Sequence, residues 1–199
     1  MLVKICGIKT IEAANVAVQA GADFIGFVFA PSKRKITPEE AAKIVKTIPK
    51  SVQTVGVFVN ESVENIKQIA ELVDLDVIQL HGDEPPEMIG ELPYQTIKAF
   101  SIDQVDAQTI NSYLTDYYLI DSPIGEHRGG TGKTFNWKRA TDLGIDFNKV
   151  ILAGGLSPSN VQDAIRQVSP VGIDVSSGVE TNGKKDHETI KQFIRNAKG

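Results

Sequence analysis

Eight short apolar segments recur along the chain, and their spacing constrains the fold more than any other feature of the sequence. They are rich in β-branched and aromatic residues, and several are apolar at nearly every position. Strands that are covered on both faces in a parallel sheet have this composition. We therefore expect strands at Leu2–Cys6, Phe24–Phe29, Thr54–Val59, Val77–His81, Thr96–Phe100, Tyr117–Asp121, Val150–Ala153 and Gly172–Ser176.

Signals for helix starts separate the expected strands. They are Thr10, Thr37 with the capping-box residue Glu40, Ser62, Ser157-Pro158 and Asp186. Alternating strands and helices predict a parallel sheet with right-handed crossovers. Eight such units in 199 residues favour a closed (β/α)8 TIM barrel that forms one domain over residues 1–199. The alternative is an open doubly wound sheet, but its Gly-rich turn after the first strand is missing from Cys6-Gly7-Ile8-Lys9.

Composition argues against several classes of function. The formal net charge is −4, and the basic cluster Ser32–Lys35 is too short for a nucleic-acid site, although it could meet an anion on a small molecule. The single cysteine excludes an internal disulfide and a CxxC metal site, and no His or carboxylate pair has metal-ligand spacing. Neither a signal-peptide pattern nor an apolar stretch of membrane-spanning length is present. We expect a cytoplasmic protein that binds no nucleic acid, membrane or metal.

In a barrel of this kind the active site lies at the carboxyl ends of the strands. Cys6 ends the first expected strand and is either a small buried hydrophobe or a thiolate acting as base or nucleophile. Asp121 ends the sixth, where a carboxylate is costly to bury without a role, although a turn-capping role would also explain it. His81 ends the fourth and is either structural or functional. The remaining candidates at this end are Arg34, Asn60, Gly154-Gly155 and Asp174–Gly178.

Two loops carry the signals of a phosphate site. Gly154 and Gly155 follow the seventh expected strand, and Ser176 and Ser177 follow the eighth. Glycines let the backbone approach a ligand closely, and phosphate sites of TIM barrels often use these two loops. The segment 129–134 resembles a P-loop but lacks its first glycine, since His127 occupies that position. We interpret the Gly-rich segment 123–135 as a flexible loop over the site.

Several of these motifs occur in a characteristic order. They are Lys4-Ile5-Cys6-Gly7-Ile8, Gly26–Phe29, Ser32-Lys33-Arg34, Gly56–Asn60, Gln79-Leu80-His81-Gly82, Gly130–Phe135, Ala153-Gly154-Gly155-Leu156 and Asp174–Glu180. Together they resemble the motifs of the phosphoribosylanthranilate isomerase family of tryptophan biosynthesis, from Met1 to the last expected helix, with no departure at a functional position.

The resemblance implies a reaction and a set of roles. The reaction is a cofactor-free Amadori rearrangement of N-(5'-phosphoribosyl)anthranilate to the carboxyphenylamino-deoxyribulose phosphate. It implies that Cys6 is the general base, that Asp121 is the general acid and that Arg34 holds the anthranilate carboxylate. We expect His81 and Asp174 to line the substrate pocket. The resemblance also favours a monomer over a homodimer.

Other readings of the same scaffold remain open. The histidine-pathway sugar isomerase, and bifunctional isomerases that serve both pathways, resemble this chain but carry Asp where Cys6 stands. Indoleglycerol-phosphate synthase needs catalytic Lys and Glu on early strands, and Lys4 lies within its strand instead. A non-catalytic binder of phosphorylated ligands would keep the two phosphate loops but would not need Cys6 and Asp121 together.

Overall fold

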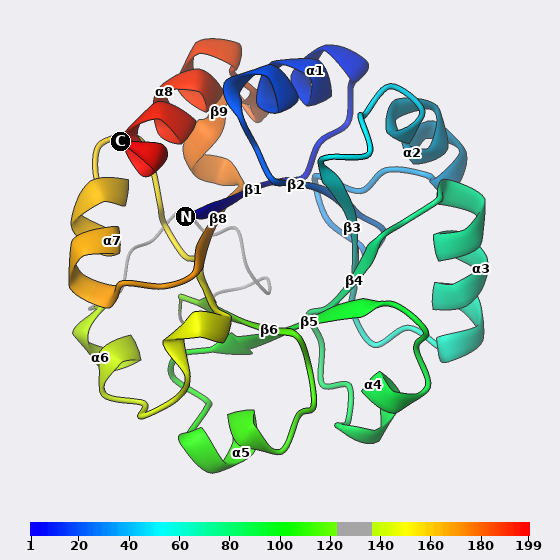
Figure 1. Ribbon diagram of the computed structural model, residues 1–199. Coiled ribbons are helices and arrows are strands. Elements are labelled where there is room, and N and C mark those ends of the chain that lie inside the picture. The colour runs from blue at the N-terminus through cyan, green and yellow to red at the C-terminus, as the bar shows by residue number, and fades with distance from the viewer. Residues whose placement is uncertain (123–136) are drawn as a thin grey trace.

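The computed structural model describes residues 1–122 and 137–199, and it shows a closed barrel of eight parallel strands surrounded by helices (Figure 1). The strands follow one another around the barrel in chain order, and the last pairs with the first. This topology confirms the predicted (β/α)8 TIM barrel and excludes the open sheet. The strands are β1 Leu2–Cys6, β2 Phe24–Val28, β3 Gln53–Phe58, β4 Val77–Leu80, β5 Gln95–Ser101, β6 Tyr117–Asp121, β7 Val150–Leu152 and β8 Gly172–Val175.

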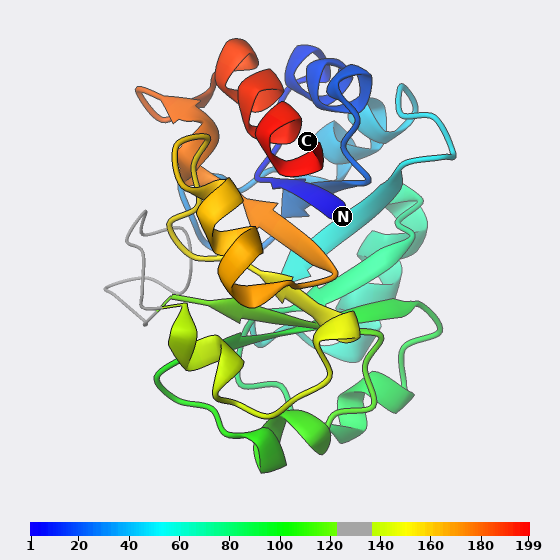
Figure 2. The same cartoon turned by 60° about the vertical axis from the view of Figure 1, so that its left-hand side comes forward.

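Eight α-helices lie between or after these strands in the described part of the chain. Five have eight or more residues: α1 Ile11–Ala20, α2 Pro38–Val45, α3 Val63–Val73, α7 Val161–Val168 and α8 His187–Lys198. Three are single turns: α4 Glu87–Gly90, α5 Ala107–Asn111 and α6 Lys138–Thr141. A 3-10 turn, η2 (Ser177–Val179), and a hairpin of β9 (Glu180–Thr181) and β10 (Lys184–Lys185) follow β8. In Figure 2 helix α8 lies beside α1.

Four of the predicted helix starts are confirmed by side-chain caps. The side chains of Thr10, Thr37, Ser62 and Asp186 each accept a hydrogen bond from a backbone N–H in the first turn. The prediction of a helix from Ser157-Pro158 is wrong, because α7 begins at Val161 with Asn160 as its N-cap. The Asn160 side chain accepts from the Ser157 N–H at 2.8 Å and donates to the Gly155 carbonyl at 3.0 Å. These bonds hold the intervening residues in a turn.

The barrel interior is a packed core. Its apolar layer comes from side chains on strands β2 to β7 and from one residue directly after β7: Phe24, Val55, Val77, Ile97, Ala99, Leu119, Ile151 and Ala153. A larger apolar cluster fills the space between the strands and the outer helices. Because the interior is filled, a ligand can enter only at the ends of the strands. No helix in residues 1–122 and 137–199 is long and apolar enough to cross a membrane.

Candidate active site

Cys6 ends β1 at the carboxyl mouth of the barrel, where it is buried with 7% of its surface exposed. Two residues earlier on the same face of the strand, Lys4 is completely buried and forms an ion pair with Asp174 of β8 at 2.9 Å. Gly26 of β2 lies opposite Cys6 in the strand register. The structure thus places the predicted residues Cys6 and Asp174 around one buried lysine.

Opposing effects act on the protonation of Cys6. Burial raises the pKa of the thiol, the positive charge of Lys4 lowers it, the carboxylate of Asp174 raises it and Lys185 lowers it. The net effect is a pKa above the usual value of a cysteine, because burial outweighs the two lysines. The direction of this shift favours the neutral thiol in the free protein. The sequence had left this protonation state open.

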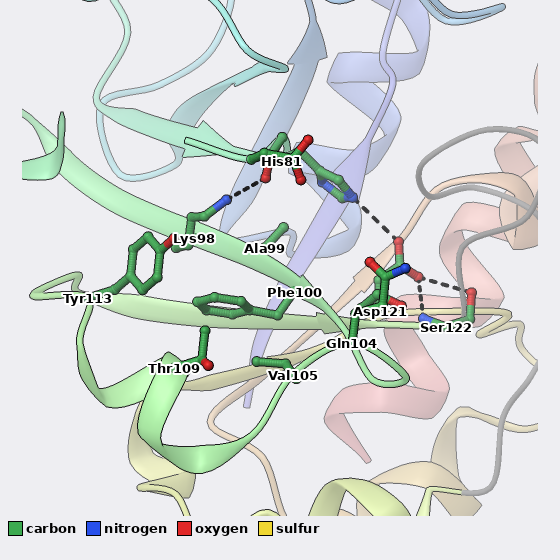
Figure 3. A pocket seen from close by; sticks show the side chains of 13 residues that line it. His81, Lys98, Ala99, Phe100, Gln104, Val105, Thr109, Tyr113, Asp121 and Ser122 are labelled. Carbon is green, nitrogen blue, oxygen red and sulfur yellow. Dashed lines mark hydrogen bonds and ion pairs between the residues drawn. The ribbon is translucent and has the colours of Figure 1, made fainter. Parts of the chain in front are cut away.

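Asp121 ends β6 on the other side of the mouth and is also buried. Its Oδ1 accepts hydrogen bonds from the backbone N–H of Ser122 at 2.7 Å and from the Ser122 hydroxyl at 3.2 Å. Its Oδ2 faces Nε2 of His81 at 3.7 Å, as Figure 3 shows. Nε2 of Gln79 lies 2.9 Å from Nδ1 of His81, and this contact orients the ring. The predicted residues His81 and Asp121 are thus neighbours in the fold.

A cavity of about 240 Å³ opens beside this pair, over the carboxyl ends of β4, β5 and β6. Figure 3 shows His81 and Asp121 toward one end of it, with Tyr113 toward the other. The rings of Phe100 and Tyr113 pack edge to face at 5.2 Å between centroids. The cavity therefore has the ionisable side chains of His81 and Asp121 toward one end and the aromatic ring of Tyr113 toward the other.

Arg34, in the loop after β2, is not a free cation at the mouth of the barrel. Its Nε and Nη2 donate to the two carboxylate oxygens of Glu180 at 2.7 and 2.9 Å. Glu180 also accepts from the ammonium group of Lys185 at 2.7 Å, and Lys185 donates to the Ser176 carbonyl at 2.8 Å. These contacts tie the predicted substrate-binding arginine to the hairpin after β8.

The two predicted phosphate loops touch each other. Gly154 and Gly155 have positive φ angles of 83° and 64°, which favour glycine. A Cβ on Gly178 would lie 1.8 Å from the Leu156 carbonyl oxygen, so the loop after β8 packs directly on the loop after β7. The Ser176 hydroxyl donates to the Cys6 carbonyl at 3.2 Å, and Ser177 begins η2. The loops follow β7 and β8. In the order of strands around the barrel they therefore lie between β6, which carries Asp121, and β1, which carries Cys6.

One other candidate from the sequence, Asn60, contacts a neighbouring loop. Asn60 has a φ of 51° and accepts from the backbone N–H of Asp83 at 2.7 Å, so its side chain braces the loop after β4. His127, the P-loop-like segment and the loop at 123–135 lie outside the described residues.

Sequence reasoning did not assign roles to four charged residues that the structure brings into or next to the site. They are Lys4, Lys98, Glu180 and Lys185. Lys4 and Lys98 each stand inside an apolar strand segment, and this signal could have identified them as buried charges that need partners. Glu180 and Lys185 carry no such signal, because they follow the last strand in a polar stretch.

Comparison with known proteins agrees with this geometry. A family model described as "N-(5'phosphoribosyl)anthranilate (PRA) isomerase" matches residues 3–196. The chain belongs to the phosphoribosylanthranilate isomerase family. Its function is therefore the isomerisation of N-(5'-phosphoribosyl)anthranilate in tryptophan biosynthesis.

Individual phosphoribosylanthranilate isomerases match over nearly their whole length. The enzyme of Oceanobacillus iheyensis is 51% identical over 98% of this chain and 96% of its own. That of a Listeria monocytogenes strain of serotype 4b is 48% identical over 100% and 99%. Among solved structures, the isomerase of Thermus thermophilus has a TM-score of 0.90 at 35% identity and 98% coverage of both chains. A second isomerase, solved in complex with reduced 1-(o-carboxyphenylamino)-1-deoxyribulose 5-phosphate, has a TM-score of 0.82 at 40% identity and full coverage of both chains.

Proposed function

We propose that Cys6 and Asp121 carry out the acid–base chemistry of this isomerisation. Asp121 protonates the ribose ring oxygen, so the ring opens to a Schiff base. Cys6, in its thiolate form, then removes the proton from C2, and the double bond shifts to give the enolamine that becomes the 2-ketose. Each proton transfer by a positioned group contributes about 10²–10⁴-fold to the rate, and the reaction needs no cofactor.

One observation carries this proposal. A buried thiol and a buried carboxylate stand at the carboxyl ends of β1 and β6, and the two glycine- and serine-containing loops meet between these strands in barrel order. A substrate whose phosphate is held by Gly154, Gly155, Ser176 and Ser177 would extend its sugar between Cys6 and Asp121. Holding both reacting groups in place in this way supplies a further part of the rate enhancement.

Arg34 can still bind the anthranilate carboxylate while it is paired with Glu180. A guanidinium has five N–H donors, and Glu180 takes one on Nε and one on Nη2. The donors on Nη1 and the second donor on Nη2 are left for a ligand. We propose sugar contacts for His81 and Asp174, because His81 lies beside Asp121 and Asp174 lies beside the Lys4–Cys6 pair.

We also propose that the protein acts as a monomer. The large apolar side chains exposed in the described residues are Met1, Ile11, Leu72 and Leu114, which belong to four different segments. A stable dimer interface usually has a contiguous apolar centre. A related isomerase from Thermotoga maritima is described as dimeric, so light scattering on a sizing column is the direct test. Because the protein is an enzyme of amino-acid biosynthesis, we propose that it is cytoplasmic.

The roles of the two residues can be tested by following the fluorescence of freshly generated phosphoribosylanthranilate. We expect Cys6→Ala, Cys6→Ser and Asp121→Asn each to lose about 10²–10⁴-fold in turnover. Circular dichroism should remain native, and calorimetry should still detect the reduced product analogue. Asp142→Asn, at an exposed carboxylate after α6, is the matched control and should turn over like the wild type. Wild-type turnover in both Cys6→Ala and Asp121→Asn would overturn the assignment.

A further inference from the structure

Lys4 is a charged residue in the barrel interior that the roles above leave unused. Its side chain is completely buried, and Asp174 is the partner in its ion pair at 2.9 Å. Removing an ammonium group from water costs several kcal/mol unless good partners compensate. An apolar residue would fill the position without this cost, so the charge itself calls for an explanation.

The strand geometry brings the Lys4 ammonium group next to Cys6. Residues two apart on a strand point to the same face, so Lys4 and Cys6 both face the interior. Opposite Cys6, Gly26 leaves a hollow that both side chains enter. A Cβ added to Gly26 would lie 3.1 Å from the Cys6 Sγ and 3.2 Å from the Lys4 Nζ. The sulfur and the ammonium nitrogen thus share one small space.

We propose that Lys4 is a positioning residue that stabilises the thiolate of Cys6, while Asp174 holds the Lys4 ammonium group in place. The proposal deepens the proposed function, since it explains how a buried cysteine becomes a base. The proton that leaves the sulfur goes to solvent, and the negative charge that remains faces the ammonium group. Lys4 does not itself contact the reacting carbon.

The surrounding charges support this assignment. Cys6 faces Lys4 on its own strand, Asp174 on β8, Lys185 on β10 and Arg34 in the loop after β2. Burial lowers the pKa of Lys4, but Asp174 and Cys6 outweigh it and raise that pKa above its usual value. These interactions favour the charged form of Lys4.

Lys185 is the competing source of positive charge, and its situation differs. Burial lowers its pKa more than Glu180 raises it, so its charge is held less firmly than that of Lys4. Its ammonium group is also directed to Glu180 and to the Ser176 carbonyl. We therefore assign the larger effect on Cys6 to Lys4.

The test measures the titration of Cys6 without substrate. The chain has one cysteine, so the pH dependence of alkylation by iodoacetamide, checked against thiolate absorbance, reports on Cys6 alone. Replacing Lys4 with methionine should raise the midpoint by about 1–2 pH units, which is a tenfold to hundredfold loss of thiolate at a fixed lower pH. Lys4→Arg keeps the positive charge, so its Cys6 midpoint should lie close to that of the wild type. The acid limb of the pH profile of kcat/KM should move to higher pH together with the Cys6 midpoint.

Two controls separate this effect from a loss of packing. Lys98→Met removes another buried lysine with a carboxylate partner, Glu84 at 2.9 Å, from the other side of the barrel, and should leave the Cys6 midpoint unchanged. If Lys4→Met does not fold, Gly26→Ala provides the second variant, because its methyl group enters the shared hollow and should also raise the midpoint. Gly90→Ala, where a Cβ meets nothing within 4 Å, is its matched control.

The outcomes can be told apart. A Cys6 midpoint that stays at the wild-type value in folded Lys4→Met, or in Gly26→Ala, overturns the proposal. A midpoint that rises in Lys185→Met but not in Lys4→Met also overturns it and assigns the role to the hairpin. If Cys6→Ala were fully active, the proposed function would fail, yet the titration would still show whether Lys4 controls the thiol.

Discussion

Among single residues, Glu180 connects parts of the site that are far apart in the sequence. It pairs with Arg34 through both oxygens and with Lys185 through one, and 9% of its side chain is exposed. Burial alone would raise the pKa of its carboxyl group, but the hydrogen bonds and charges of Arg34 and Lys185 outweigh burial and hold the pKa below its ordinary value of 4.5. The ionised form is thus favoured by folding.

The depressed pKa of Glu180 predicts a pH-dependent contribution to stability. The contribution is fully present above pH 4.5, the ordinary pKa, and is lost as the pH falls through the lower folded value. We expect Glu180→Gln to lower the free energy of unfolding by about 1–3 kcal/mol at neutral pH, and by less in acid. Urea unfolding above and below pH 4.5 measures this. Glu188→Gln, at a carboxylate that is 83% exposed, should show no such difference, and an equal loss at both pH values in Glu180→Gln would contradict the assignment.

Residues at strand ends could be predicted from the sequence, whereas their partners could not. Cys6, His81 and Asp121 interrupt or end apolar segments, which is a local signal. The pairing of Arg34 with Glu180 spans 146 residues, and no local pattern indicates it. The net protonation of Cys6 depends on burial and on charges from β1, β8 and β10, so it needed the fold.

At the scale of elements, the loop after β7 supports the strand end that carries Asp121. A Cβ on Gly154 would lie 2.5 Å from the Ser122 nitrogen and 3.1 Å from Oδ1 of Asp121. The loop after β7 therefore packs closely against the strand end that carries this carboxylate. Gly144, after α6, also has a positive φ, but a Cβ there meets nothing within 4 Å.

These two glycines form a matched pair for experiment. An alanine at either position adopts a left-handed conformation at a cost of about 1–2 kcal/mol in stability. We expect Gly144→Ala to show this cost with unchanged kcat/KM. Gly154→Ala should lose kcat/KM in addition, because its methyl group displaces Ser122 and Asp121. Steady-state kinetics and urea unfolding give both quantities, and equal kcat/KM in the two variants would show that the loop does not position the acid.

Elements were predictable where their signals were local and long enough. The N-caps at Thr10, Thr37, Ser62 and Asp186 and all eight strands are confirmed, with differences of one residue at several strand ends. The single-turn helices α4, α5 and α6 are too short to show a helical period, so the sequence did not reveal them. The start of α7 depends on Asn160, whose two side-chain bonds form only in the folded loop.

For the whole molecule, closure of the barrel joins the first and last parts of the chain. Strand β1 pairs with β8, and α8 packs on α1, so neither end can form its core without the other. The alternation of strands and helices predicted this closure, because eight units of this length fit a ring. Phe193 of α8 is completely buried in the outer cluster of the core.

The closure predicts that a defect in α8 destabilises the whole barrel. We expect Phe193→Ala to lower the free energy of unfolding by about 3–5 kcal/mol. The kcat/KM of the folded protein should be retained, because the residue belongs to the outer core cluster and does not line the cavity. Gln192→Ala, exposed on the same helix, should change stability by less than about 0.5 kcal/mol. Far-ultraviolet circular dichroism reports all helices, whereas fluorescence reports the single tryptophan, Trp137, next to α6. If the ring unfolds as one unit, both midpoints move together in Phe193→Ala. Separate midpoints would show that α8 and α1 open while the rest of the barrel stays folded.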